Sequence, residues 1–490
     1  MKIKHLIAII CILAFSVSSA YAIQENKSPE KNKKKAERVV EKKKKKAEKA
    51  AKKNKKASQE NDIEYTNDVH SVFSLNDCID IAIRKNPEIR ASLFNEEVYK
   101  SQILQAWANY FPSISVGIDG SRSGTKYSHI KNQNMPYRTM YTTMGYLPTL
   151  SADMLLFDFG KTKASADRAR NLYHASKEDT KENINSIIYD IKATYYNILF
   201  AQAQVRVYED TVQDYELQLQ QAWSFYKLGK KAKLDVVTAE YNLGKAKLNL
   251  VKAKNVLEVV QVELSKIMGI PEYTNYELSD PMAVDKYDIT QEEAIKTAME
   301  VRPELNSAIK TAKAAKMKLR AQRREFAPDL GIYGSYDNGI GNEYNLRSTQ
   351  IGVGLSYSNM NILQTKKLVD QARAEYNKSL AELENTKHTV YYNVKKAYMD
   401  LQTDKESIFI AKLALDQAKE QYRQVTGRYK AGVGDAIELK DGENTYLNAR
   451  LDFYNAILNY NVTAASLEKE IGIPLQNSGE SILSLSPEDI

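Results

Sequence analysis

The stretch AWSFYKLGKKAKLDVVTAEYNLGKAKLNL, residues 222–250, returns in a diverged form as GRYKAGVGDAIELKDGENTYLNARLDF, residues 427–453. One shift of 203 positions aligns the landmark residues of both stretches and their continuations: Tyr226 with Tyr429, Gly229 with Gly432, Glu240 with Glu443, and Pro271 with Pro474. No gap is needed across about fifty positions. A chain with such self-similarity is built from two copies of one structural unit.

The duplication extends upstream of these stretches. A shift of 216 positions pairs Asn86-Pro87-Glu88 with Arg302-Pro303-Glu304, and Phe111-Pro112 with Phe326-Ala327-Pro328. The first copy therefore has 13 extra residues in the segment that follows Pro112. The duplication predicts three segments: a first repeat at 74–271, a second repeat at 272–474, and a C-terminal tail at 475–490.

Very long helices are the main structural expectation for both copies. Proline is absent from 149 to 270 and again from 329 to 473. Apolar residues spaced alternately three and four apart form a heptad seam for coiled-coil packing, running through Leu243, Ala246, Leu250, Ala253, Leu257, Val260, Leu264 and Ile267. We expect helices at about 88–110, 160–227, 235–268, 304–326, 362–430 and 438–470. The two longest would each measure roughly 100 Å, at ~1.5 Å per residue.

Each copy also contains two short segments in which apolar residues alternate with small or polar ones. In QIGVGLSYS, residues 350–358, Ile351, Val353, Leu355 and Tyr357 lie on one side of an extended chain. The other alternating segments are 114–118, 149–155 and 330–332. Apolar outside and small or polar inside is the pattern of a transmembrane β-barrel strand. An ordinary two-hairpin sheet on a soluble helical protein is the alternative.

The number of such segments bears on assembly. Four strands cannot close a barrel, because about eight are the fewest that enclose side chains. A barrel would therefore require several copies of the chain. Aromatic residues near the segment ends would suit an interfacial girdle: Tyr110, Phe111, Tyr146, Phe157, Phe159, Tyr333, Tyr336 and Tyr357.

The N-terminus has the pattern of a secretory signal. Two lysines precede an apolar run from Leu6 to Phe15, and small residues follow up to Ala22. We expect residues 1–22 to be removed after Ala22 and the mature protein to be exported. The apolar run is shorter than the ~20 residues that a membrane-spanning helix needs.

The formal net charge of +8 is unevenly distributed. Residues 23–57 hold 16 Lys/Arg and 5 Asp/Glu, whereas residues 58–490 carry a net charge of −5. We expect a separate Lys-rich extension at 23–61, too charged to bury a core, as a solvated helix or a disordered segment. It would serve as a solvated spacer or contact an anionic surface such as phospholipid, lipopolysaccharide or cell wall. Export argues against nucleic acid as its partner.

Taken together, these residues resemble the TolC-like outer membrane efflux protein family over about 74–474. The resemblance rests on the two Asn/Arg-Pro-Glu motifs, the two Phe-(x)-Pro motifs, and Phe157-Asp158-Phe159-Gly160 at the start of a long helix. Two Tyr-x-x-Gly turns and two Gly-Ile-Pro helix ends complete it. The order, spacing and duplication of these motifs are more specific than any one of them.

This resemblance implies a mixed α/β membrane protein of the cell outer membrane. Three copies would form a homotrimer, with four strands per subunit in a twelve-stranded transmembrane β-barrel embedded in outer-membrane lipid. Twelve packed helices would form an α-helical tunnel in the periplasm, with a mixed α/β girdle from residues such as 269–303. The implied function is the passive channel-tunnel of a tripartite efflux or type I secretion system.

The resemblance also implies a role for the two helix turns. They would form the periplasmic tip that receives an adaptor protein attached to an inner-membrane pump. The turn residues are Leu228, Gly229 and Lys230 in the first copy, and Ala431, Gly432 and Val433 in the second. The glycines permit the left-handed backbone that a tight turn between antiparallel helices requires.

Glu438 and Asp441 match the positions at which this family narrows its entrance with acidic side chains. They are three residues apart and share one face of a helix, so three copies would form stacked carboxylate rings that favour cations. Glu438 replaces the commoner aspartate, and Lys440 could partly neutralise the ring. Asp235 is the first-copy equivalent of Glu438. The alternative for these acids is stabilisation of helix N-termini through the macrodipole.

No pattern typical of an enzyme is present. There is no phosphate-cradling glycine loop and no nucleophile elbow. Cys11 lies in the signal, so Cys78 is the one thiol of the expected mature chain and no intramolecular disulfide forms. The histidines downstream of the signal are scattered without metal-ligand spacing: His70, His129, His174 and His388. We expect no catalytic activity, no cofactor and no metal site.

Two other protein classes stay open. A periplasmic coiled-coil adaptor or scaffold would have a similar helical hairpin, but adaptors normally carry one hairpin flanked by lipoyl-like and β-barrel domains. A surface structural protein with long helices is the other, and the four amphipathic segments at repeat-equivalent positions argue against it. Within the channel hypothesis, the cargo could be drugs, metals or proteins.

Overall fold

The computed structural model describes residues 72–125, 141–270, 277–278, 284–287, 289–341, 345–357, 361–474 and 477–481. All of them belong to one structural unit, Ser71–Ile490. Several predictions lie outside the described residues: the signal at 1–22, the Lys-rich extension at 23–61, and most of the tail at 475–490.

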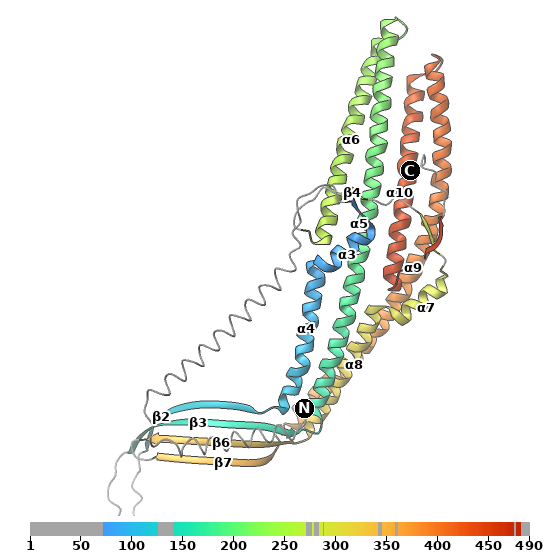
Figure 1. The fold of residues 1–490 in the computed structure, drawn as a ribbon. Helices are drawn as coiled ribbons and strands as arrows, with labels where there is room; N and C mark the ends of the chain where they lie inside the picture. The colour runs from blue at the N-terminus through green and yellow to red at the C-terminus, as the bar shows by residue number, and fades with distance from the viewer. Residues whose placement is uncertain are drawn as a thin grey trace, which may run out of the picture. The chain divides into compact units, whose positions relative to one another are not determined.

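The six predicted helices are confirmed, with boundaries within a few residues. They are α4 (Pro87–Trp107), α5 (Lys161–Lys227), α6 (Lys233–Met268), α8 (Pro303–Arg323), α9 (Ile362–Lys430) and α10 (Ala436–Ile471). Single 3₁₀ turns, η1 (Ala108–Tyr110) and η2 (Arg324–Phe326), follow α4 and α8. Figure 1 shows two hairpins of long helices, α5 with α6 and α9 with α10, whose tips lie at the end opposite the sheet.

The four alternating segments form one antiparallel sheet, and its strands are longer than the sequence predicted. They are β2 (Ser113–Thr125), β3 (Tyr141–Phe157), β6 (Asp329–Gly341) and β7 (Asn345–Ser356), in the order β2-β3-β6-β7. The extra length comes from Ser-, Gly- and Thr-rich ends, where apolar alternation is too weak to detect.

The strand register brings all the apolar alternations onto one face. Ile114 pairs with Ala152, Ala152 with Gly334, and Gly334 with Ile351, so one row crosses the sheet. Because side chains alternate along a strand, every second residue shares this face. The large apolar residues exposed on it are Ile114, Val116, Ile118, Leu150, Ile332, Ile351, Val353 and Leu355. This arrangement fits the lipid-facing side of a membrane sheet.

The helices pack side by side as a wall that continues the sheet. Towards the sheet the order is α4–α5–α8–α9, and towards the tips it is α6–α5–α10–α9. The seam alanines Ala246, Ala253, Ala449 and Ala456 are buried, which lets neighbouring helices approach closely.

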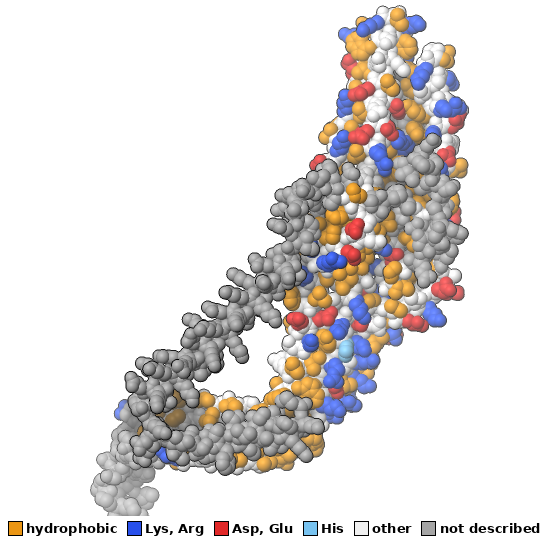
Figure 2. Space-filling model, in the orientation of Figure 1, with side chains coloured by type: hydrophobic (Ala, Val, Ile, Leu, Met, Phe, Trp, Pro, Cys, Tyr) orange, Lys and Arg blue, Asp and Glu red, His pale blue; other side chains and the backbone are white. Residues whose placement is uncertain are grey.

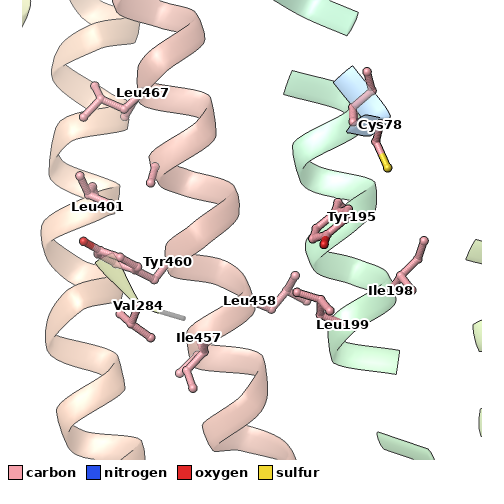
Figure 3. Packing of buried hydrophobic residues seen from close by; sticks show 14 of the residues in the cluster. Cys78, Tyr195, Ile198, Leu199, Val284, Leu401, Ile457, Leu458, Tyr460 and Leu467 are labelled. Carbon is pink, nitrogen blue, oxygen red and sulfur yellow. The ribbon is translucent and has the colours of Figure 1, made fainter. Parts of the chain in front are cut away.

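The main core lies midway along the hairpins, where α5, α9 and α10 meet. Figure 3 shows Leu199 of α5 beside Leu458 of α10, and Leu401 of α9 near Tyr460 of α10. Tyr460 is almost fully buried and stacks on Tyr287, with ring centroids 6.4 Å apart. The core therefore ties both hairpins together at mid-height.

The individual helices and strands of a small layer of short elements were not predicted from the sequence. It comprises β1 (Val72–Phe73), α3 (Leu75–Lys85), β4 (Glu277–Leu278), β5 (Asp285–Tyr287), α7 (Gln291–Val301) and β8 (Asn477–Ser481). Strand β1 pairs with β4 and β5 with β8, while α3 packs on α5 and α6, and α7 on α9 and α10. These elements supply the mixed α/β girdle that the resemblance implied.

Each repeat contains the same internal contact, between the residue before its proline and the end of its last long helix. The Asn86 side-chain amide donates to the Ile267 carbonyl oxygen at 2.7 Å. The Arg302 guanidinium donates to the Glu470 carbonyl oxygen at 3.3 Å. Asn86 and Arg302 are the repeat-equivalent residues before the two prolines, and Ile267 and Glu470 are separated by the 203 positions of the tip alignment. The duplication in sequence is thus a duplication of structure.

Candidate functional site

Both helix hairpins turn at a glycine with left-handed backbone. The φ angle is +70° at Gly229 and +77° at Gly432. The Lys230 N–H donates to the Phe225 carbonyl at 2.9 Å, and the Val433 N–H donates to the Arg428 carbonyl at 3.1 Å. These are the bonds of a glycine-terminated helix, in which an L side chain would be strained.

The two turns form adjoining exposed surfaces. Leu228 is 69% exposed and Val433 is 73% exposed. The Lys231 Nζ lies 4.1 Å from the ring centroid of Tyr429, which joins the first turn to the second hairpin. The structure therefore brings the predicted tip residues to one exposed end: Leu228, Gly229, Lys230, Ala431, Gly432 and Val433.

The three predicted entrance acids have different surroundings. Asp235 accepts a hydrogen bond from the Ala232 N–H at 3.1 Å, so its carboxylate caps α6. Glu438 forms an ion pair of 3.4 Å with Arg428, which precedes the turn. Asp441 is exposed, and its carboxylate has no ion-pair partner among the described residues. The cation paired with Glu438 in this structure is thus Arg428.

A buried polar network below the tips was missed from the sequence. Glu443 of α10 is only 5% exposed, and the Gln218 side-chain amide of α5 donates to its carboxylate at 3.2 Å. Its other oxygen has no hydrogen-bond partner by distance and angle among the described residues. Glu443 lies one residue off the α10 seam, next to Gly442, so the heptad spacing does not indicate that it is buried.

Two further contacts extend this network between the hairpins. The Tyr422 hydroxyl of α9 donates to Asp214 of α5 at 3.1 Å. Arg450 of α10 pairs with Asp210 of α5 at 2.8 Å. Tyr422 also stacks on Tyr446, with ring centroids 5.4 Å apart. Polar contacts therefore link α5 of the first hairpin to both helices of the second.

Burial dominates the electrostatics of the network. It raises the pKa of Glu443 to about 7, although hydrogen bonds from Gln218 and Tyr215 oppose the shift. Burial also raises the pKa of Asp214, against the hydrogen bond from Tyr422. A carboxyl group that titrates near neutrality at the junction of two helix hairpins is suited to respond to pH.

The described part of the chain contains neither a membrane-spanning helix nor a cluster of metal ligands. None of the described helices is long and apolar enough to cross a membrane. No group of three or more His, Cys, Asp or Glu side chains within the described ranges is placed to hold a metal ion. The exposed hairpin tips and the buried polar network below them are the candidate functional sites.

Comparison with known proteins gives one family match, described as outer membrane efflux protein, over residues 78–270 and 294–472. The probable efflux pump outer membrane protein TtgC of Pseudomonas putida KT2440 is 20% identical over 414 residues, which cover 81% of this chain and 83% of TtgC. The antibiotic efflux pump outer membrane protein ArpC of Pseudomonas putida matches to the same extent.

Solved structures share the fold. The Campylobacter jejuni CmeC outer membrane channel superposes with a TM-score of 0.68 at 17% identity, covering 83% of this chain and 87% of CmeC. The open state of the Neisseria gonorrhoeae MtrE outer membrane channel gives 0.67 at 21% identity, covering 82% of this chain and 89% of MtrE.

Proposed function

Because this chain belongs to the outer membrane efflux protein family and is an outer-membrane channel-tunnel subunit, we propose that it is the passive duct of a tripartite assembly. In this proposal a homotrimer receives cargo from an inner-membrane pump through a periplasmic adaptor protein that contacts the hairpin tips. The names of the relatives favour efflux over type I secretion. Transport through such a duct requires no chemistry from this chain.

The observation that carries the proposal is the open sheet with one apolar exposed face. Its edge strands β2 and β7 each have one neighbour among the described strands. Four strands cannot enclose a barrel, but three copies supply twelve. In a head-to-tail ring, the β2 edge of one protomer pairs with the β7 edge of the next, so neither edge is left without a hydrogen-bonded neighbour. This geometry supports a channel over the alternative of a periplasmic adaptor or scaffold.

The helical wall supports the same assembly. Its edge helices near the tips, α6 and α9, expose apolar stripes. On α6 these residues include Leu234, Val237, Tyr241, Leu248, Val251, Val259 and Val262. On α9 they include Tyr392, Met399, Ile410 and Leu413. Contact between the α6 edge of one protomer and the α9 edge of the next would remove both stripes from water.

Electron microscopy of detergent-extracted protein from outer membranes tests the assembly. We expect threefold particles longer than roughly 100 Å, because helices α5 and α9 alone reach that length at ~1.5 Å per residue. Monomers or dimers that leave the membrane fraction without detergent would contradict the duct and favour a scaffold.

We further propose that Glu438 and Asp441 form acidic rings at the tunnel entrance. Replacing both by alanine removes six carboxylates from a trimer, so the cation-to-anion permeability ratio should fall several-fold and block by divalent cations should weaken. Reversal potentials in planar bilayers measure the ratio. Unchanged selectivity would exclude the rings.

Asp235 needs a separate variant because its carboxylate caps α6. Asp235→Asn retains an oxygen that can accept the capping bond and removes the charge. A fall in cation preference would place Asp235 in the ring. An unchanged cation preference would limit the role of Asp235 to capping the start of α6.

A further inference from the structure

Helix α8 carries an unpaired basic stripe near the sheet. Lys313, Lys316, Arg320 and Arg323 are all exposed, and none has an ion-pair partner among the described residues. Their spacing of three, four and three places them on one side of the helix. In Figure 2, Lys and Arg side chains gather over the part of the helices that adjoins the sheet.

The fold itself does not require this charge. At the repeat-equivalent positions, 216 residues earlier, helix α4 has Glu97, Lys100, Leu104 and Trp107. Leu104, in the place of Arg320, is 74% exposed. The same wall is therefore built once with a basic stripe and once without it, which favours a binding role for the stripe.

The stripe does not lie at a subunit edge. Helix α8 packs against α5 on one side and α9 on the other, so its exposed sides face the tunnel or the periplasm. Asn306 and Lys310, earlier on the same exposed side, line a hollow with Glu300 and Val301 from the end of α7. The stripe thus continues the side of the wall on which α7 packs.

In the trimer of the proposed function, on which this step rests, that side is the outer one. Twelve helices about 10 Å apart form a ring of roughly 19 Å radius, leaving a bore of roughly 14 Å radius. A second layer of helices and strands about 10 Å thick would nearly fill this bore. The layer that contains α3 and α7 therefore fits outside the ring, and the stripe faces the periplasm.

The stripe ends where the membrane begins. Arg323 is three residues before Phe326, which is 42% exposed and lies three residues before strand β6 begins at Asp329. At ~1.5 Å per residue, Arg323 and Arg320 lie about 5 and 9 Å from Phe326, and Lys313 lies about 20 Å away. The headgroup layer is about 5–8 Å thick, within reach of both arginine side chains.

We propose that the Lys313–Arg323 stripe binds anionic phospholipid headgroups of the periplasmic leaflet of the outer membrane. The arginines, nearest the membrane, present planar forks that bind phosphate oxygens with two hydrogen bonds. Lys316 lies within about one Debye length of the headgroup layer and adds attraction without direct contact. In a trimer, three such stripes alternate with three α4 stripes of no net charge, so anionic lipid gathers at three positions around the channel.

Native mass spectrometry of the purified trimer, with phosphatidylglycerol and phosphatidylethanolamine in equal amounts, tests this proposal. The wild-type trimer should retain phosphatidylglycerol preferentially, and added salt should weaken the preference. Arg320→Gln with Arg323→Gln should lower phosphatidylglycerol affinity by roughly 30-fold, at about 5-fold per cation. Phosphatidylethanolamine binding should not change. The spectra also show whether each variant remains trimeric.

Lys227→Gln with Lys233→Gln is the matched control, because it removes the same charge from two exposed lysines near the tip, remote from the membrane. It should bind phosphatidylglycerol like the wild type. Equal phosphatidylglycerol binding by the stripe variant and wild type would overturn the proposal. A second result would also overturn it: the stripe variant no longer sediments with purified cell-wall sacculi but still binds phosphatidylglycerol. That result would assign the stripe to the cell wall.

Discussion

Single-channel recordings should show that the channel opens more readily as pH rises from about 5 to about 8. The responsible group is Glu443, whose pKa burial raises to about 7. If opening separates the hairpins, water reaches Glu443 and its pKa returns to the ordinary value near 4.3. The protonated carboxyl then belongs to the closed arrangement and the ionised one to the open arrangement.

The sign and size of the effect follow from linkage. Below about pH 4.3 Glu443 is protonated in both states and closure is most favoured. Between the two pKa values only the open state loses its proton, so closure weakens as pH rises, by up to about 4 kcal/mol per protomer. Asp214 contributes in the same direction, because burial raises its pKa too. The nearby cation Arg450 forms its ion pair with Asp210 of α5 and not with Glu443.

Glu443→Gln should flatten this pH response, because the amide imitates the protonated carboxyl and keeps the closed arrangement at pH 8. Glu240→Gln is the matched control: Glu240 is the repeat-equivalent acid and is exposed. The control should respond to pH like the wild type. If Glu443→Gln channels still show the wild-type increase in opening from pH 5 to pH 8, another group controls the response.

The long helices and the membrane strands could be predicted because each rests on a repeated local pattern. Heptad spacing predicted α6 and α10, and the absence of proline together with the glycine turns placed α5 and α9 almost to the residue. The short helices α3 and α7 were missed although both are amphipathic over their 11 residues. Their capping boxes, Ser74 with Asp77 and Thr290 with Glu293, are 216 positions apart and could have revealed them.

The site was less predictable, because its contacts join residues far apart in the sequence. The turn glycines follow from local backbone needs, and both have positive φ angles. Glu443, however, aligns with Glu240, and the alignment gives no indication that one is buried and the other exposed. That difference depends on α10 packing between α5 and α9, whereas α6 lies at the edge of the wall.

Replacing Arg302 by methionine should cause the largest loss of stability, about 3–5 kcal/mol per protomer. Arg302 is 4% exposed and forms ion pairs with the Glu470 carboxylate and, at 3.1 Å, with Glu304. Glu182 approaches it to 4.0 Å, and burial raises the pKa of that carboxyl. Methionine fills a similar volume but leaves the partly buried carboxylates of Glu470 and Glu182 without this cation.

Thermal unfolding of the trimer, followed by circular dichroism, measures this loss against two comparisons. Asn86→Ala alters the repeat-equivalent site, where one hydrogen bond and a helix cap are lost without any buried charge, so about 1–2 kcal/mol is expected. Arg302→Met with Glu470→Leu should lose less than Arg302→Met alone, because the main unpaired carboxylate is removed. If the double variant is the less stable one, the contact with the Glu470 backbone, rather than charge pairing, accounts for the role of Arg302.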